Sequence, residues 1–355
     1  MPTPVDRAAL HTLVSDVLKT TPITDIHTHL FAPSFGELLL WGLDELLTYH
    51  YLVAEAFRAA DDGMDYARYW SLPKTTQAEW VWEHLFRRRS PISEAGRGVL
   101  TCLQALGCDP AERDLQRLRA AFPSGSTEAQ IERVLTLSRV STLVMTNDPF
   151  DAQERALWQR NPARDERFHA ALRLDRLLVD WAGAGATLTE LGYTVQTDAT
   201  GRTRDEVARF VRDWIARTRP VYLAVSLPPE FTCPARTHAS TMLTEVLLPM
   251  AREAGLPVAL MLGCRKLVNP GLRLAGDAVG RADLNALTHL CVTYPQNRFL
   301  CTVLSRENQH ELAVIARKFH NLHIFGCWWF LNTPSLIDEL TRLRLELLGL
   351  SFTPQ

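Results

Sequence analysis

The chain lacks several features that would assign it to a specialised class of protein. No apolar run approaches the ~20 residues that a membrane-spanning helix needs, and the run Leu38-Leu39-Leu40-Trp41 is soon followed by Asp44 and Glu45. An excess of one charge is also lacking, because 38 basic residues are balanced by 40 acidic ones and the net charge is −2. A polyanion would require a basic surface, so we expect neither a nucleic acid nor a membrane as a partner.

A disulfide pattern is missing too. The seven cysteines are odd in number and widely scattered, and no Cys-x-x-Cys pair occurs. Residues 1–20 have the pattern of an amphipathic helix, without the basic and then apolar regions of a secretory signal. We therefore expect reduced thiols in a soluble cytoplasmic protein. The composition, 46% hydrophobic and 22% charged, is that of a globular protein with a sizeable core.

What is present is a regular alternation of short apolar segments with helical ones. We expect an N-terminal helix in residues 1–22, a first strand at 23–31 and a mostly helical insertion across residues 36–135. Further strands are expected at 140–146, 168–174, 221–227, 257–262, 298–304, 322–327 and 348–352. Near-continuous apolar strands separated by helices are typical of a parallel sheet that is buried on both faces. Eight such strands predict an α/β fold, a (β/α)₈ TIM barrel over residues 23–355.

Two histidines end the first expected strand. His27 and His29 are two residues apart, and alternate residues of a strand share a face, so both imidazoles should point the same way. Two neutral imidazoles on one rigid strand make half of a zinc-type metal site, which an acid or amide elsewhere must complete. A pair of buried, hydrogen-bonded histidines is the alternative.

The active site of a TIM barrel lies at the carboxyl ends of its strands. Asp148 follows the second expected strand, Arg173 and Asp175 follow the third, and Trp328 and Trp329 follow the seventh. Carboxylates and an arginine near two imidazoles suit a small anionic, hydroxylated substrate, because the planar guanidinium matches a carboxylate. Each has a structural alternative: a turn or cap for Asp148, an internal ion pair for Arg173 and Asp175, and packing for the tryptophans.

The insertion contributes one more candidate. Tyr49-His50-Tyr51 follows an amphipathic run, and a histidine there could fold over the barrel mouth as an acid or base. A packing or surface role is the alternative for His50.

These segments, taken together, resemble the uronate isomerase (glucuronate isomerase) branch of the amidohydrolase superfamily. The resemblance runs from residue 22 to the end. It is carried, in order, by Asp25-Ile26-His27-Thr28-His29, His50-Tyr51, Thr146-Asn147-Asp148-Pro149-Phe150-Asp151, Arg173-Leu174-Asp175 and Trp328-Trp329-Phe330.

The chain also departs from this family's pattern. Met261 stands where the family carries a histidine on strand 5, and no aspartate precedes Tyr49. The family's strand-8 Asp-Ser-Arg, whose aspartate is the third protein ligand of the metal, would begin at about Gln355. The sequence alone is compatible with a fragment of a longer protein and with a divergent, inactive relative. If the chain is a fragment, we expect it to bind metal weakly and to be only marginally stable.

The resemblance implies a metal-assisted aldose–ketose isomerase that converts D-glucuronate to D-fructuronate, an enzyme of carbohydrate metabolism. A divalent metal, with zinc favoured, would bind His27 and His29, and Arg173 would bind the substrate carboxylate. The catalytic candidates are His50, Tyr51 and Asp148, and the substrate-binding candidates are Arg173, Asp175, Trp328 and Trp329. A metal-dependent lactonase or esterase of the same superfamily and an inactive barrel are the alternatives. The expected binding partner is a small sugar acid. The sequence is also compatible with a homo-oligomer.

Overall fold

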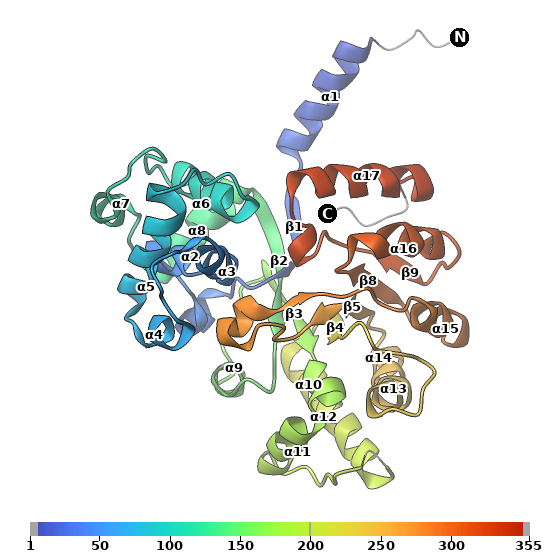
Figure 1. Cartoon of the computed structure of the whole chain (residues 1–355). Helices are drawn as coiled ribbons and strands as arrows, with labels where there is room; N and C mark the ends of the chain where they lie inside the picture. Colours follow the sequence, from blue (N-terminus) through green and yellow to red (C-terminus); the bar gives the residue numbers. More distant parts are fainter. Residues whose placement is uncertain (1–5, 199, 351–355) are drawn as a thin grey trace.

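Seven parallel strands form the central sheet, in the order β1-β2-β3-β4-β5-β8-β9 (Figure 1). The computed structural model describes residues 6–198 and 200–350. The strands of this sheet are β1 (Ile23–Thr28), β2 (Val140–Asn147), β3 (Phe168–Arg173), β4 (Tyr222–Leu227), β5 (Val258–Leu262), β8 (Phe299–Val303) and β9 (Leu322–Ile324). Parallel neighbours need long crossover connections, which the helices provide.

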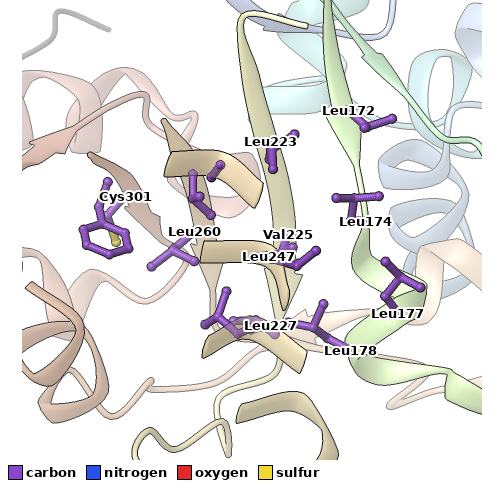
Figure 2. Packing of buried hydrophobic residues seen from close by; sticks show 14 of the residues in the cluster. Leu172, Leu174, Leu177, Leu178, Leu223, Val225, Leu227, Leu247, Leu260 and Cys301 are labelled. Atoms are coloured by element: carbon purple, nitrogen blue, oxygen red, sulfur yellow. The ribbon is translucent and has the colours of Figure 1, made fainter. Parts of the chain in front are cut away.

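The two faces of the sheet carry side chains of different size. Large aliphatic residues on one face pack against the helices, and Figure 2 shows part of this cluster, including Leu172, Leu223, Val225, Leu260 and Cys301. Residues in alternate positions form a smaller buried cluster on the other face, namely Val144, Ala171, Tyr222, Ala224, Ala259, Met261 and Phe325. Three alanines suit the confined concave face of a curled sheet.

Helices alternate with the strands from β2 onwards. They are α9 (Ala152–Gln159), α10 (Asp175–Val179), α11 (Trp181–Glu190), α12 (Arg202–Thr218), α13 (His238–Met242), η3 (Leu243–Leu247), α14 (Leu248–Glu253), α15 (Asn285–Thr293), η5 (Arg306–Asn308), α16 (Gln309–Ala316), η6 (Trp329–Leu331) and α17 (Pro334–Leu348). Their starts follow ordinary capping chemistry: the Asp151 carboxylate accepts the Glu154 amide at α9, and the Thr333 hydroxyl accepts the Leu336 amide at α17.

Between β1 and β2 the described chain makes only helices. They are η1 (Pro33–Leu38), α2 (Leu43–Leu47), α3 (His50–Ala59), α4 (Tyr66–Ser71), α5 (Lys74–Trp82), η2 (Glu83–Arg87), α6 (Glu94–Ala105), α7 (Leu115–Ala121) and α8 (Thr127–Ser138). Most of them share a hydrophobic cluster separate from those of the sheet, built around Leu47, Val53, Tyr69, Trp82 and Leu103. This segment lies to one side of the sheet (Figure 1).

The loop after β5 forms a hairpin that the sequence analysis did not predict. Two short antiparallel strands, β6 (Cys264–Arg265) and β7 (Ala278–Val279), flank the 3₁₀ segment η4 (Pro270–Gly276). Leu272 of η4 is buried in the cluster of the helical segment. The hairpin therefore joins the strand ends of the sheet to the helices between β1 and β2.

Among the described residues, the eighth expected strand is not found. Leu348 is the last residue of α17, Gly349 ends that helix at a φ of 64°, and residues 351–352 lie outside the described part of the chain. The leucines of α17 recur at helical spacing, so Leu348 continues a helix, and glycine readily adopts the positive φ at which this helix ends. The first strand is also shorter than the predicted 23–31, because β1 ends at Thr28. Within the described residues, β1 pairs only with β2 and β9 only with β8.

The N-terminal helix α1 (Arg7–Thr20) projects away from the rest of the molecule (Figure 1). None of its residues is buried, and Leu13 and Leu18 are exposed. Searched over the described residues, the structure contains no helix with the length and apolar character needed to cross a membrane.

Candidate active site

His27 and His29 lie at the end of β1 and present their rings on the same side. His27 is in the strand and His29 follows it directly, and their ring centres are 5.8 Å apart at an angle of 84°. His27 also faces Phe325, at 6.5 Å between ring centres, so its ring points into the concave side of the sheet. The predicted common orientation of the two imidazoles is therefore the one observed.

Two hydroxyl groups determine which ring nitrogen of each histidine carries the proton. Nδ1 of His27 lies 3.2 Å from the Tyr222 hydroxyl, which donates its own proton to the carbonyl of Ile26 at 2.8 Å. A hydroxyl has only one proton to donate, so the Tyr222 oxygen must accept from His27 Nδ1–H. The unprotonated Nε2 of His27 is then left for a ligand.

The same arrangement holds His29. Its Nδ1 lies 3.0 Å from the Thr146 hydroxyl, whose proton goes to the carbonyl of Thr28 at 3.1 Å. His29 therefore also donates through Nδ1 and keeps a lone pair on Nε2. Hydrogen bonds of this kind orient metal-binding histidines in known sites.

Both imidazoles are neutral near pH 7. Burial lowers the pKa of His27 to about 3, with further lowering by His29 and by the positive charge of Arg173. Burial and Arg173 also lower the pKa of His29. Neutral imidazole is the form that binds a metal ion.

Arg173 and Asp175 form an ion pair at the end of β3. Nε of Arg173 donates to Oδ2 of Asp175 at 3.0 Å, and a second donor, Nη2, binds the same oxygen. The other oxygen of Asp175 accepts the backbone amide of Ser226 at the end of β4. The internal ion pair considered for these residues is therefore present, and it fastens two neighbouring strand ends together.

Asp148 and Glu154 place two further carboxyl groups beside this ion pair. Oδ1 of Asp148 accepts the Phe150 amide at 2.9 Å, which is a turn contact, and burial raises the pKa of Asp148. Glu154 is 5% exposed, and it accepts the Asp148 amide at 3.0 Å and the Asn147 side chain at 2.7 Å. Burial raises the pKa of Glu154 to about 7. Glu154 was not among the residues predicted from the sequence, although a glutamate in the first helical turn after a strand-end carboxylate is a visible signal.

An aromatic cluster forms the other side of the site. His50 opens α3, and its ring centre lies 5.9 Å from that of Trp329 at the start of η6. Tyr51 lies 6.3 Å from Trp329, which stacks on Phe330 at 4.8 Å. Burial lowers the pKa of His50 and raises that of Tyr51, so the imidazole is neutral and the phenol keeps its proton near pH 7. His29 contributes to the pKa of His50, which places the cluster near the histidine pair.

Trp328 and Met261 belong to the floor of the site. Trp328 packs against the cluster on the concave face, and Met261, where the family pattern has a histidine, is 2% exposed within that cluster. Packing is therefore the role that the structure supports for Trp328.

The β6–β7 hairpin adds residues that the sequence analysis did not select. Nζ of Lys266 lies 2.6 Å from Oδ2 of Asp277 and 5.7 Å from the centre of the Trp329 ring. The charges of both residues affect the pKa of His50. Lys266 and Asp277 are eleven residues apart in a loop that has no recognisable motif. The sequence therefore did not indicate that they pair.

The donor set fits a metal only in part. The two imidazole rings lie 5.8 Å apart, but no group of three or more His, Cys, Asp or Glu side chains in residues 6–198 and 200–350 could hold a metal ion. A surface recess of about 660 Å³ lies elsewhere, on the helices between β1 and β2, and is lined by charged residues such as Glu79 and Arg113.

Solved structures of uronate and glucuronate isomerases resemble this chain. No protein-family model matches it, and none of the curated proteins is similar to it. Two structures share the fold at low identity: a uronate isomerase from Thermotoga maritima (16% identity, TM-score 0.69, covering 92% of this chain and 81% of that one) and a glucuronate isomerase from Caulobacter crescentus (18%, 0.73, 98% and 82%).

A third structure is much more similar. The uronate isomerase from Bacillus halodurans superposes with a TM-score of 0.95, and the alignment covers 99% of this chain and 83% of that one. Identity over that alignment is 51%. At this identity and coverage, the chain belongs to the uronate isomerase family.

Proposed function

We propose that this protein is an aldose–ketose isomerase that converts a uronic acid of the D-glucuronate type to the corresponding ketose of the D-fructuronate type. The observation that carries the proposal is the 51% identity to the Bacillus halodurans uronate isomerase. The geometry supports it independently, because a pair of neutral imidazoles, an ion pair and a neutral histidine with two aromatic neighbours border one region at the strand ends.

The reaction moves a proton from C2 of the open-chain sugar to C1 and a hydroxyl proton from O2 to O1. His50 is neutral and can accept the C2 proton as a general base and return it to C1. Tyr51 keeps its phenolic proton and can donate a hydrogen bond to a sugar oxygen during ring opening. Asp148, whose pKa is raised by burial, is the second candidate for carrying a proton between O2 and O1.

The histidine pair would hold the metal. Nε2 of His27 and Nε2 of His29 would be its two protein ligands, because Nδ1 of each ring faces a hydroxyl group. A divalent ion there, with zinc favoured by the imidazole donors, would supply Lewis-acid polarisation of a substrate oxygen. The substrate-binding residues would be Arg173, which would bind the substrate carboxylate, its ion-pair partner Asp175, and Trp328 and Trp329.

We further infer that the seven-stranded sheet belongs to a (β/α)₈ barrel in which the helices within residues 36–135 are an insertion after strand 1. The parallel strand order, the small residues on the concave face and the gathering of functional residues at strand ends support this. We also propose that the protein is located in the cytoplasm. Sedimentation of the purified protein can test whether it forms a homo-oligomer.

The test is to incubate the purified protein with D-glucuronate and a divalent metal and to follow ketose formation. The same protein is incubated with a sugar-acid lactone. Isomerisation that is lost in the His27→Asn and His29→Asn double variant supports the proposal. Lactone hydrolysis without isomerisation would assign the protein to the metal-dependent hydrolases instead, and no turnover of either compound would indicate an inactive relative.

A further inference from the structure

A small recess lies at the opposite end of the sheet from the histidine pair. Its volume is about 60 Å³, and its lining includes Phe168 at the start of β3, Thr218 at the end of α12, Arg164 from the segment before β3 and Arg219 from the segment before β4. Because β3 and β4 are parallel, residues that precede them lie at the amino end of the sheet, away from the candidate active site. One water molecule takes up about 30 Å³ of the liquid, so the recess has room for one small ion.

The walls of this recess are apolar and held in place. Phe35 and Trp158 are buried, and their ring centres lie 5.0 Å apart. The Ser34 hydroxyl donates to the carbonyl of Ala163 at 2.8 Å, which ties the segment that carries Arg164 to η1. Binding of an ion would therefore require little ordering of the walls.

Arg164 is fixed at the recess but keeps unused donors. Its Nη1 donates to the carbonyl of Thr218 at 3.2 Å, and its Nη2 donates to the carbonyl of Arg217 at 2.6 Å. These two carbonyls end α12, so the guanidinium lies at the negative end of that helix dipole. A guanidinium has five N–H donors, and the described residues accept only two from Arg164.

Arg219 places a second cation beside Arg164. It follows α12 at a φ of 50°, and residues 6–198 and 200–350 give its guanidinium neither a hydrogen-bond acceptor nor an acidic partner. Burial lowers the pKa of Arg164, and the positive charge of Arg219 lowers it further. The two cations are therefore close enough to repel each other, and an anion between them would offset that repulsion.

The carboxylate that lines the recess is already neutralised. Oδ1 of Asp165 accepts Nε of Arg167 at 3.0 Å, and Oδ2 accepts Nη2 of the same residue at 2.7 Å. Glu132 binds Arg167 as well, at 2.6 Å. Within the described chain, Arg217 has no carboxylate partner either. Positive charge therefore exceeds negative charge around the recess.

We propose that this recess binds a small tetrahedral oxyanion of the phosphate or sulfate class between the guanidinium groups of Arg164 and Arg219. Paired N–H groups of a guanidinium match two oxygens of such an anion, and the bonds are charge-assisted. A tetrahedral anion has oxygens for both guanidinium groups, whereas a carboxylate has only two. The phosphoryl group of an organic phosphate ester offers the same chemistry. The bound anion joins the end of α12 to the segment before β3 and so stabilises the folded protein.

The experiment measures the binding of inorganic phosphate by calorimetry at constant ionic strength. It compares wild-type protein with Arg219→Gln, Arg219→Lys and a control, Arg212→Gln. Arg212 is exposed on α12 and pairs with Glu253, so the control removes one positive charge from the same helix. Loss of the charge-assisted bonds should weaken phosphate binding about 10- to 100-fold in Arg219→Gln. Arg219→Lys, which keeps the charge but not the planar fork, should lie between the two. The control should stay within about threefold of wild type, because salt screens exposed charges.

Thermal unfolding provides a second measurement. Phosphate should raise the Tm of wild-type protein more than that of Arg219→Gln, because the ion binds the folded state. Acetate at the same ionic strength should raise neither by more than sodium chloride does. Glycerol 3-phosphate identifies the source of the anion: tighter binding than phosphate indicates an ester, and weaker binding indicates the free ion.

Three results would overturn this assignment. They are equal phosphate affinity in wild type and Arg219→Gln, no binding of phosphate to wild type at millimolar concentration, and tighter binding of acetate than of phosphate. Circular dichroism verifies that Arg219→Gln is folded. If it is not, Arg219→Asn replaces it, because asparagine accepts the left-handed backbone of this position.

Discussion

Tyr222 on β4 reaches across the concave face of the sheet to His27 on β1, with 3.2 Å between its hydroxyl oxygen and His27 Nδ1. Two strands, β2 and β3, separate β1 from β4 in the sheet order. A flat sheet would not allow this contact, so it depends on the curl of the sheet. The same hydroxyl donates to Ile26, and this second bond makes His27 a donor through Nδ1 and leaves Nε2 free.

Replacing Tyr222 with phenylalanine should therefore weaken metal binding. The variant removes the acceptor for His27 Nδ1–H, and loss of such a partner typically reduces metal affinity 10- to 100-fold. Zinc titration of wild-type and Tyr222→Phe protein measures the effect. Tyr193→Phe is the matched control, because that hydroxyl binds Asp213, away from the histidines. Equal zinc affinity in wild type and Tyr222→Phe would show that the hydroxyl does not orient His27.

Replacing Arg173 with lysine should raise KM for D-glucuronate far more than KM for D-glucuronamide, its uncharged amide. The planar fork of Arg173 matches a carboxylate, and lysine cannot reproduce its pair of bonds. We expect the two compounds to differ because only the acid carries the charge that the guanidinium would bind. Equal effects on both compounds would mean that Arg173 is structural.

Replacing His50 with asparagine should lower kcat by about 10²- to 10⁴-fold, the usual contribution of a general base. KM should change little, because the imidazole acts on the reacting carbons. His310→Asn is the control, since His310 is exposed on α16. A kcat within a few-fold of wild type would leave His50 with a packing role against Trp329.

Glu154 should make stability depend on pH. Burial raises its pKa from an ordinary 4.5 to about 7, so the folded protein holds this proton more tightly than the unfolded chain does. Stability should therefore fall as the pH rises from about 4.5 to about 7, by at most about 3 kcal/mol, and stay lowered above that.

Glu154→Gln removes this titration. The free energy of unfolding of the variant should improve relative to wild type between pH 5 and pH 7.5, as measured by urea denaturation at several pH values. Glu190→Gln serves as the control, because Glu190 is exposed at the end of α11. Parallel pH curves for wild type and Glu154→Gln would mean that the carboxyl group is ionised throughout this range.

Much of the framework could be predicted from local sequence. Apolar runs such as Val258–Leu262 have no polar face, so they can only be buried strands or helices, and their length and neighbours favour strands. The orientation of His27 and His29 follows from the period of a strand, which is a local property. Leu348 was predicted wrongly because a leucine at the end of an amphipathic helix has the same local pattern as one at the start of a strand.

The sequence by itself determined the seven parallel strands, the helices between them and a histidine pair on one face, because periodicity and burial act over a few residues. Only the tertiary structure decided how that pair is used. Tyr222 reaches His27 across 195 positions of sequence, Glu154 folds back on Asp148, and Lys266 meets Trp329 from another loop. Such contacts depend on the curl of the sheet and on the path of the β6–β7 hairpin. Both arise from packing between segments far apart in the chain, for which a single sequence has no local signal.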